Sequence, residues 1–227
     1  MKKLLAIICV LLAIFIGMYI YKSNINQGTV NVSEVEKIET YISKIYMWQE
    51  ITGEALPKFD SINDAPDLWT WEVVKKNLEN YEISYDEIQE KAKEIFGDKF
   101  TKQFPKEGSE YIQYNEELGK YVTTGIGLDT LDDTFFIKNI SKNKNEYEVE
   151  IVEYLEDYEN SMGIETEDEV YDIYIKDLEQ NTIATIKSNE GETRAIEVVK
   201  ENLDKFTTKK VKLIRDSSDN IYVENVK

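Results

Sequence analysis

Histidine is absent from this chain of 227 residues. The imidazole ring is the base in Ser-His-Asp and Cys-His nucleophilic systems, a frequent zinc ligand and the side chain that titrates nearest to neutral pH. Its absence excludes the most familiar hydrolase mechanisms and histidine-ligated zinc. Carboxylate chemistry, Ser-Lys or Tyr nucleophiles and oxygen-ligated metal ions remain.

Cysteine occurs once, at Cys9, and basic residues are in deficit. A single cysteine cannot form a disulfide within the chain, so packing must stabilise any domain that follows it. The chain has 27 Lys and Arg against 45 Asp and Glu, a formal charge of −18. Phosphate binding needs clustered basic residues, so nucleic acid is disfavoured as a partner. Solubility explains the acidity, and attraction of cations or basic partners is the alternative.

An apolar run from Leu4 to Tyr21 follows Lys2 and Lys3. As a helix it would span roughly 27 Å, close to the hydrocarbon thickness of a bilayer. A cleaved signal peptide is the alternative, but signal peptidase prefers small residues where this run ends in Met18-Tyr19-Ile20-Tyr21. The pattern favours an uncleaved anchor.

Two further features bear on this segment. Lipidation at Cys9 would need a small residue directly before it, whereas the chain has Ile8 there. Two lysines before the run and Lys22 alone after it favour a cytoplasmic N-terminus and an external C-terminal domain. We therefore expect a single-pass cell-membrane protein with a transmembrane anchor at 1–22, a stalk at 23–32 and an extracytoplasmic domain at 33–227.

Apolar periodicity and capping residues predict three helices at the start of the domain. Capping boxes are expected at Ser33 with Glu36 and at Ser84 with Glu87, and Asp64 is the expected N-cap of the helix between them. The expected helices span residues 33–50, 65–80 and 84–97.

Alternating apolar and polar residues predict paired strands in the rest of the chain. The expected strands span 110–114, 120–124, 135–140, 147–154, 170–176, 182–187, 209–215 and 221–226. A fourth helix is expected over 193–206, and the acidic segment 160–168 is expected to be an exposed loop. The order predicts an α+β fold with helices packed on one face of a curled, mainly antiparallel sheet.

This element order from Ser33 to Val226 resembles the α+β roll of nuclear-transport-factor-like and cystatin-like domains. The helix at 193–206, which lies before the last hairpin, departs from that pattern, and no residue motif carries the likeness. The Lys, Asn, Ile and Glu usage around the anchor resembles uncharacterised membrane-anchored surface proteins of AT-rich Gram-positive bacteria. Neither resemblance implies an active site.

Glu148 and Glu150 are the first candidates for chemistry. Their side chains project from one face of a strand roughly 7 Å apart, which falls in the range of an inverting glycosidase pair. A solvated strand face is the alternative, and it is the one the neighbouring acidic residues favour.

Calcium is the second candidate chemistry, because two acidic clusters offer oxygen ligands. The clusters are Asp129, Asp132 and Asp133, and Asp60, Asn63, Asp64 and Asp67. Neither matches an EF-hand loop. Turn and capping chemistry explains these residues equally well, so no metal or other cofactor is predicted.

Trp69, Lys210 and Lys212 form the candidate binding surface. Trp71 lies on the apolar face of its expected helix, whereas Trp69 lies off that face and is either buried by a neighbouring element or free to bind. Lys210 and Lys212 belong to a basic cluster with Lys209 and Arg215. Protection of a sheet edge explains these lysines, and docking of an acidic partner is the alternative.

We therefore expect a non-enzymatic, membrane-anchored binding or interaction domain with an envelope protein as its partner. A carboxylate-dependent hydrolase of cell-wall glycan is the first alternative. A structural component of an envelope assembly is the second.

Overall fold

The computed structural model describes residues 30–47, 55–123, 131–157 and 170–227, and for 131–133 the backbone alone. The predicted anchor at 1–22, most of the predicted stalk and the predicted loop at 160–168 lie outside these residues. Across the described ranges no helix is long and apolar enough to cross a membrane.

The fold is α+β, as predicted, with four α-helices and two antiparallel sheets in the described residues. The helices are α2 (Val32–Ile45), α3 (Asp67–Lys76), α4 (Tyr85–Phe96) and α5 (Glu192–Glu201). The small sheet has the order β1-β3-β2, with β1 (Glu82–Ile83), β2 (Ile112–Asn115) and β3 (Lys120–Thr123).

The large sheet has six strands in the order β7-β6-β5-β8-β9, with β4 on the other edge of β5. Its strands are β4 (Leu131–Asn143), β5 (Glu146–Asp157), β6 (Asp172–Lys176), β7 (Thr182–Lys187), β8 (Thr207–Arg215) and β9 (Ile221–Val226). The three hairpins expected from the alternation are present. The expected strands at 170–176 and 182–187 also pair with each other, as β6 and β7. The β4–β5 hairpin is longer than predicted.

The N-cap of helix α2 is Asn31, two residues before the predicted cap Ser33. Asn31 caps it by accepting from the Glu34 backbone N–H at 3.0 Å, and the Glu34 carboxylate accepts from the Asn31 N–H at 3.2 Å. The prediction of Ser33 and Glu36 as the box is wrong. Both pairs fit the sequence pattern of a capping box. When Asn31 is the cap, Glu34 pairs with Lys142 and Arg215 of the sheet, and the local sequence does not reveal these contacts.

The next two helices differ in how well the sequence predicts their starts. Asp64 is not the N-cap of α3, because it ends a short 3₁₀ turn and Pro66 occupies the cap position without a side-chain hydrogen bond. The capping box of Ser84 and Glu87 at α4 is confirmed. Gly97 ends α4 as predicted, with a φ of 81° that favours glycine.

Two hydrophobic clusters pack against opposite faces of β5. Val149 and Ile151 face the larger cluster, which includes α2, α3 and α4. Val152 and Tyr154 face a smaller cluster with β6, β7 and α5. The expectation that all helices cover one face is therefore wrong, because α5 packs on the face opposite to α2.

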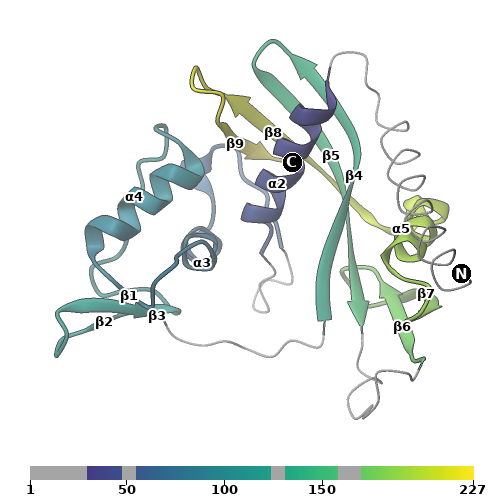
Figure 1. Ribbon diagram of the computed structural model, residues 1–227, viewed down its shortest axis with the longest axis horizontal. Coiled ribbons are helices and arrows are strands. Elements are labelled where there is room, and N and C mark those ends of the chain that lie inside the picture. The colour runs from purple at the N-terminus through teal and green to yellow at the C-terminus, as the bar shows by residue number, and fades with distance from the viewer. Residues whose placement is uncertain (1–29, 48–54, 124–130, 158–169) are drawn as a thin grey trace, which may run out of the picture.

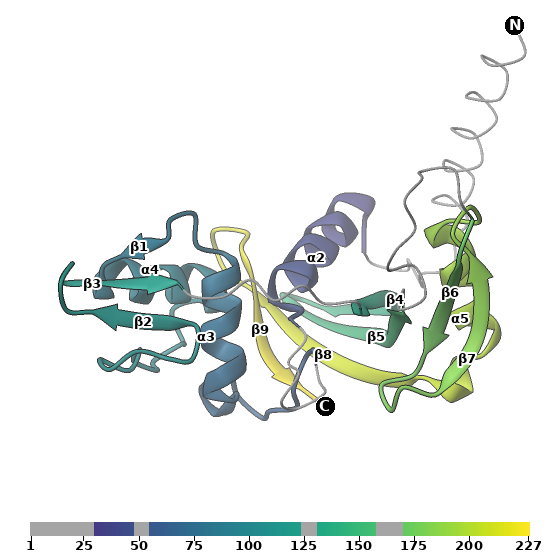
Figure 2. The ribbon, with the colours of Figure 1, turned by 90° about the horizontal axis from the view of Figure 1, so that it is seen from below.

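Helix α5 ends at Glu201, and a 3₁₀ turn at 203–205 replaces the end of the predicted helix at 193–206. Strand β8 then runs from beside α5 to the hairpin with β9 near α2, while the small sheet with α3 and α4 lies at the other end of the molecule (Figures 1 and 2). Strand β9, which follows the β8–β9 turn, contacts both α2 and α4.

Candidate binding groove

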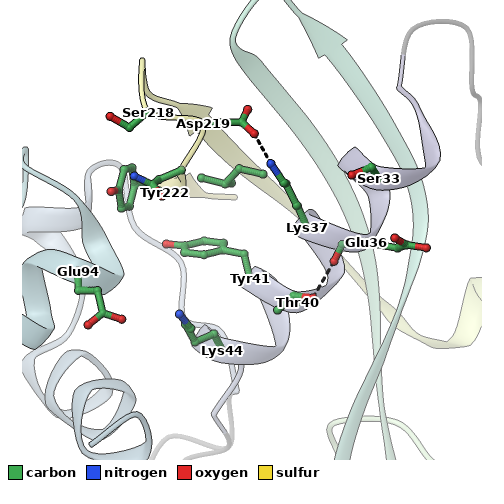
Figure 3. A pocket seen from close by; sticks show the side chains of 12 residues that line it. Ser33, Glu36, Lys37, Thr40, Tyr41, Lys44, Glu94, Ser218, Asp219 and Tyr222 are labelled. Atoms are coloured by element: carbon green, nitrogen blue, oxygen red, sulfur yellow. Dashed lines mark hydrogen bonds and ion pairs between the residues drawn. The ribbon is translucent and has the colours of Figure 1, made fainter.

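An open groove of about 560 Å³ lies between α2, α4 and the β8–β9 turn. Figure 3 shows side chains of all three elements around it. Its lining is Ser33, Glu36, Lys37, Thr40, Tyr41, Lys44, Glu94, Ser218, Asp219, Asn220, Ile221 and Tyr222. The side chains are mostly hydroxyls, amides and charges of both signs, so the groove can donate and accept hydrogen bonds along its length.

Tyr41 fixes the base of the groove. Its hydroxyl donates to the Ile95 carbonyl at 3.1 Å and accepts from the Val223 backbone N–H at 2.8 Å. One buried phenol therefore ties α2 to the end of α4 and to β9. Burial raises the pKa of Tyr41 well above its usual value, so the phenol stays neutral and keeps both bonds.

The β8–β9 turn is held by its own aspartates. The Asp216 carboxylate accepts from the backbone N–H groups of Ser218 at 2.8 Å and Asn220 at 2.9 Å, and the bond from Asn220 contributes most to lowering its pKa. Asp219 adopts a φ of 68° and pairs with Lys37 of α2. The turn is therefore fixed against α2 and gives the groove a defined wall.

Tyr222 lies between this groove and a second hollow of about 390 Å³, because it lines both. Its ring packs so closely on Gly97 that a Cβ there would lie 2.8 Å from Tyr222 Cγ. Burial raises the pKa of Tyr222, and the nearby charges of Asp216 and Asp98 raise it further. Glycine at position 97 therefore allows the positive φ at the end of α4 and leaves room for the Tyr222 ring.

The predicted binding residue Trp69 is not on the surface. Its side chain is fully buried, its indole N–H donates to the Ala55 carbonyl at 3.2 Å, and its ring contacts those of Phe59 and Phe96. The interpretation of Trp69 as buried by a neighbouring element is confirmed, and its place in a binding surface is wrong. Trp71 is buried as predicted.

Lys210 and Lys212 lie on the outer face of β8, opposite carboxylates of β5. Lys210 pairs with Glu148 at 3.3 Å and with Glu150 at 3.6 Å, and Lys212 pairs with Glu146 at 3.2 Å. Their hydrogen bonds to glutamates raise the pKa of both lysines. These residues form a cross-strand ladder of opposite charges, which we call the outer ladder.

The outer ladder changes two predictions. Strand β8 lies between β5 and β9, so its lysines do not protect a sheet edge and that explanation is wrong. Glu148, predicted as half of a carboxylate pair, is more than half exposed and shares Lys210 with Glu150. A glycosidase acid needs an apolar pocket that keeps it protonated, and this face offers none, so the solvated strand face is the correct interpretation.

The other two basic residues of the cluster point to the opposite face. Lys209 is buried, lies 3.1 Å from a carboxylate oxygen of Glu153 and donates to the Leu56 carbonyl. Arg215 donates to Glu34 at 3.1 Å. The strand period of two therefore splits the cluster, and neither residue belongs to an outer binding surface.

Three of the candidate calcium ligands, Asp60, Asn63 and Asp67, are engaged with other groups. Asp60 pairs with Lys227, Asp67 pairs with Lys102, and the Asn63 side chain accepts from the Thr101 N–H at 2.8 Å. Asp129 lies outside the described residues. Within the described residues no cluster of three or more His, Cys, Asp or Glu side chains could hold a metal ion.

The sequence patterns do not reveal the groove. Its residues come from three segments separated by about fifty and more than a hundred positions, and none forms a motif. The only local signal is the Ser217-Ser218-Asp219-Asn220 turn, which predicts a loop but not its neighbour. Comparisons with protein-family models, curated proteins and solved structures give no match, so a function for the groove rests on its geometry.

Proposed function

We propose that this chain is a non-enzymatic, membrane-anchored binding domain whose groove receives a polar segment of an envelope protein. The observation that carries the proposal is the position of Tyr222, which lines two adjoining hollows of about 560 and 390 Å³. Both volumes lie in the range of about 300–1,000 Å³ that ligand sites occupy. An extended segment could follow the hollows from one side of the ring to the other.

The charges around the groove support a polypeptide as the ligand. Lys37 of α2 pairs with Asp219, and Lys44 of α2 and Glu94 of α4 add a charge of each sign to the lining (Figure 3). A surface with both signs of charge and several hydroxyls is complementary to a segment that itself carries both signs. A uniformly charged ligand would meet repulsion from one set of these groups.

The walls of the groove are also held in place before a ligand binds. The Tyr41 hydrogen bonds, the Lys37–Asp219 pair and the turn bonds of Asp216 hold its three walls without a ligand. Binding then orders few side chains, which lowers its entropic cost. The extracytoplasmic location rests on the apolar run at 4–21 and its flanking lysines.

The proposal is tested by affinity capture with the full chain from membranes of the cells that make it. Wild-type chain should enrich a defined set of envelope proteins, and Lys44→Glu, which leaves the Lys37–Asp219 pair in place, should reduce their recovery by about tenfold because a cationic contact becomes repulsive. Lys138→Glu, an exposed charge reversal on β4, is the control and should leave recovery unchanged. Equal recovery with the groove variant would contradict the proposal.

A further inference from the structure

A third hollow, of about 370 Å³, lies on the small sheet at the far end of the molecule from α5 (Figure 2). We call it the tyrosine hollow. Its lining is Ser84, Tyr85, Lys106, Tyr114, Gly119 and Tyr121. None of these residues lines the groove beside α2, so the two hollows are separate sites.

The aromatic rings of the tyrosine hollow form a connected cluster of tilted and edge-on contacts. The Tyr121 ring lies 5.1 Å from that of Tyr114 and 6.2 Å from that of Tyr85, measured between centroids. Phe104 lies 5.2 Å behind Tyr121 and 5.0 Å from Trp71, both at nearly perpendicular angles. The floor of the hollow is therefore fixed to the hydrophobic core, and its shape exists before any ligand arrives.

The rim of the hollow exposes apolar surface that nothing in the described residues covers. Tyr114 is 46% exposed. Gly119 has a φ of 62°, and a Cβ built there would meet no atom within 4 Å, so the space beside it is open. An exposed ring beside an open space, supported from behind by buried rings, offers a flat face for stacking.

The polar groups at the edge of the hollow define the class of ligand. The Tyr121 hydroxyl donates to the Lys106 carbonyl at 2.8 Å and keeps its oxygen as an acceptor, while the Lys106 ammonium is an exposed donor. A cationic ligand would be repelled by Lys106, which opposes a role as an aromatic cage for quaternary ammonium.

We propose that the tyrosine hollow binds an oligosaccharide. A pyranose ring stacks its C–H face on Tyr114, and its hydroxyls bond to the Lys106 ammonium and the Tyr121 oxygen. The volume of about 370 Å³ lies at the lower end of the range for ligand sites, which suits one or two sugar rings. The chain would then hold glycan at one end and a protein segment in the groove beside α2.

The test is a screen of neutral and N-acetylated oligosaccharides on a glycan array, followed by titration calorimetry with the best probe. The full chain is held in nanodiscs of phosphatidylethanolamine and phosphatidylglycerol, because sugar-headed detergents would compete. We expect one or more oligosaccharides to bind, and Tyr114→Ala to weaken binding by about tenfold through loss of the stacking face.

Two controls keep the result interpretable. Tyr81→Ala removes a tyrosine that is 73% exposed near the same sheet but does not line the hollow, and it should leave the affinity unchanged. Gly119→Asn tolerates the positive φ and fills the open space, so it should abolish binding while the chain stays folded. The proposal is overturned if no oligosaccharide binds, if both alanine variants weaken binding equally, or if acetylcholine binds in place of sugars.

Discussion

The two faces of β8 carry the same kind of residue in two different environments. Lys210 and Lys212 on the outer face are open to solvent and pair with glutamates of β5 across the ladder. Lys209 and Arg215 on the inner face are buried or half-buried and bond to Glu153 and Glu34. The basic residues that are clustered in the sequence therefore form two separate sets of ion pairs, one on each face of β8.

The difference shows where binding can occur. On the outer face each lysine already has carboxylates within 3.6 Å. On the inner face the charges are covered by α2 and by the segment around Leu56. The lysines of the outer face are already paired and the charges of the inner face are covered, whereas the turn that ends β8 lines the groove beside α2 (Figure 3).

The largest effect is expected from breaking the inner pair at Lys209. Lys209→Met leaves the Glu153 carboxylate buried without its lysine, so the free energy of unfolding should fall by about 3–5 kcal/mol. Denaturant unfolding followed by tryptophan fluorescence measures this change. Lys209→Met combined with Glu153→Leu should recover most of the loss, and a single-variant loss below about 1 kcal/mol would show that the pair is not desolvated.

A smaller, pH-dependent effect is expected at Glu34. Burial opposes the charged form, but hydrogen bonds from Lys142, the Asn31 N–H and Tyr147 outweigh it and lower the pKa of Glu34 from 4.5 to about 2. A carboxylate with a lowered pKa stabilises the fold above its unfolded pKa and loses that contribution as the pH falls toward the folded value.

Glu34→Gln should therefore reduce the free energy of unfolding by about 1–2 kcal/mol at pH 7, allowing for solvent screening. The gap between variant and wild type should close as the pH falls from 4.5 to 2. Glu36→Gln, at an exposed position of the same helix, is the control and should change the free energy of unfolding at pH 7 by less than Glu34→Gln does. A gap that is constant with pH would mean that the charge of Glu34 is not what stabilises α2.

The smallest effect is expected on the outer face. Lys210→Ala removes an exposed pair, so the denaturant midpoint of unfolding should stay close to that of the wild type. High salt should reduce even a small difference, since exposed pairs are screened. If Lys210→Ala costs as much stability as Lys209→Met at the adjacent position, the contrast between the two faces is wrong.

The sequence predicts the elements of this fold better than their contacts. Predictions are correct where they depend only on neighbours in the chain. Examples are the Ser84–Glu87 capping box, the helix end at Gly97 and the strands β5 and β8. The start of α2 is not predicted, because Asn31 and Ser33 both fit a capping box and only the distant Arg215 and Lys142 favour the first.

The groove could not be predicted because its walls are assembled by tertiary contacts. Tyr41, Glu94 and Tyr222 belong to three separate elements, and no spacing in the chain relates them. Trp69 was included in the candidate binding surface although it is buried. It lies off the apolar face of α3, and the sequence does not show that Phe59 and Phe96 cover it. Burial on both sides of a helix is decided by neighbours that periodicity does not reveal.

The central claim is that partners bind in the groove beside α2 and not on the outer ladder of β8. A photo-cross-linking residue at Glu94, which lines the groove, is compared with one at Glu148, which lies in the ladder. Both positions are exposed glutamates in the full chain. We predict a discrete cross-linked partner from position 94 and none from position 148, and a partner cross-linked from position 148 alone would contradict the claim.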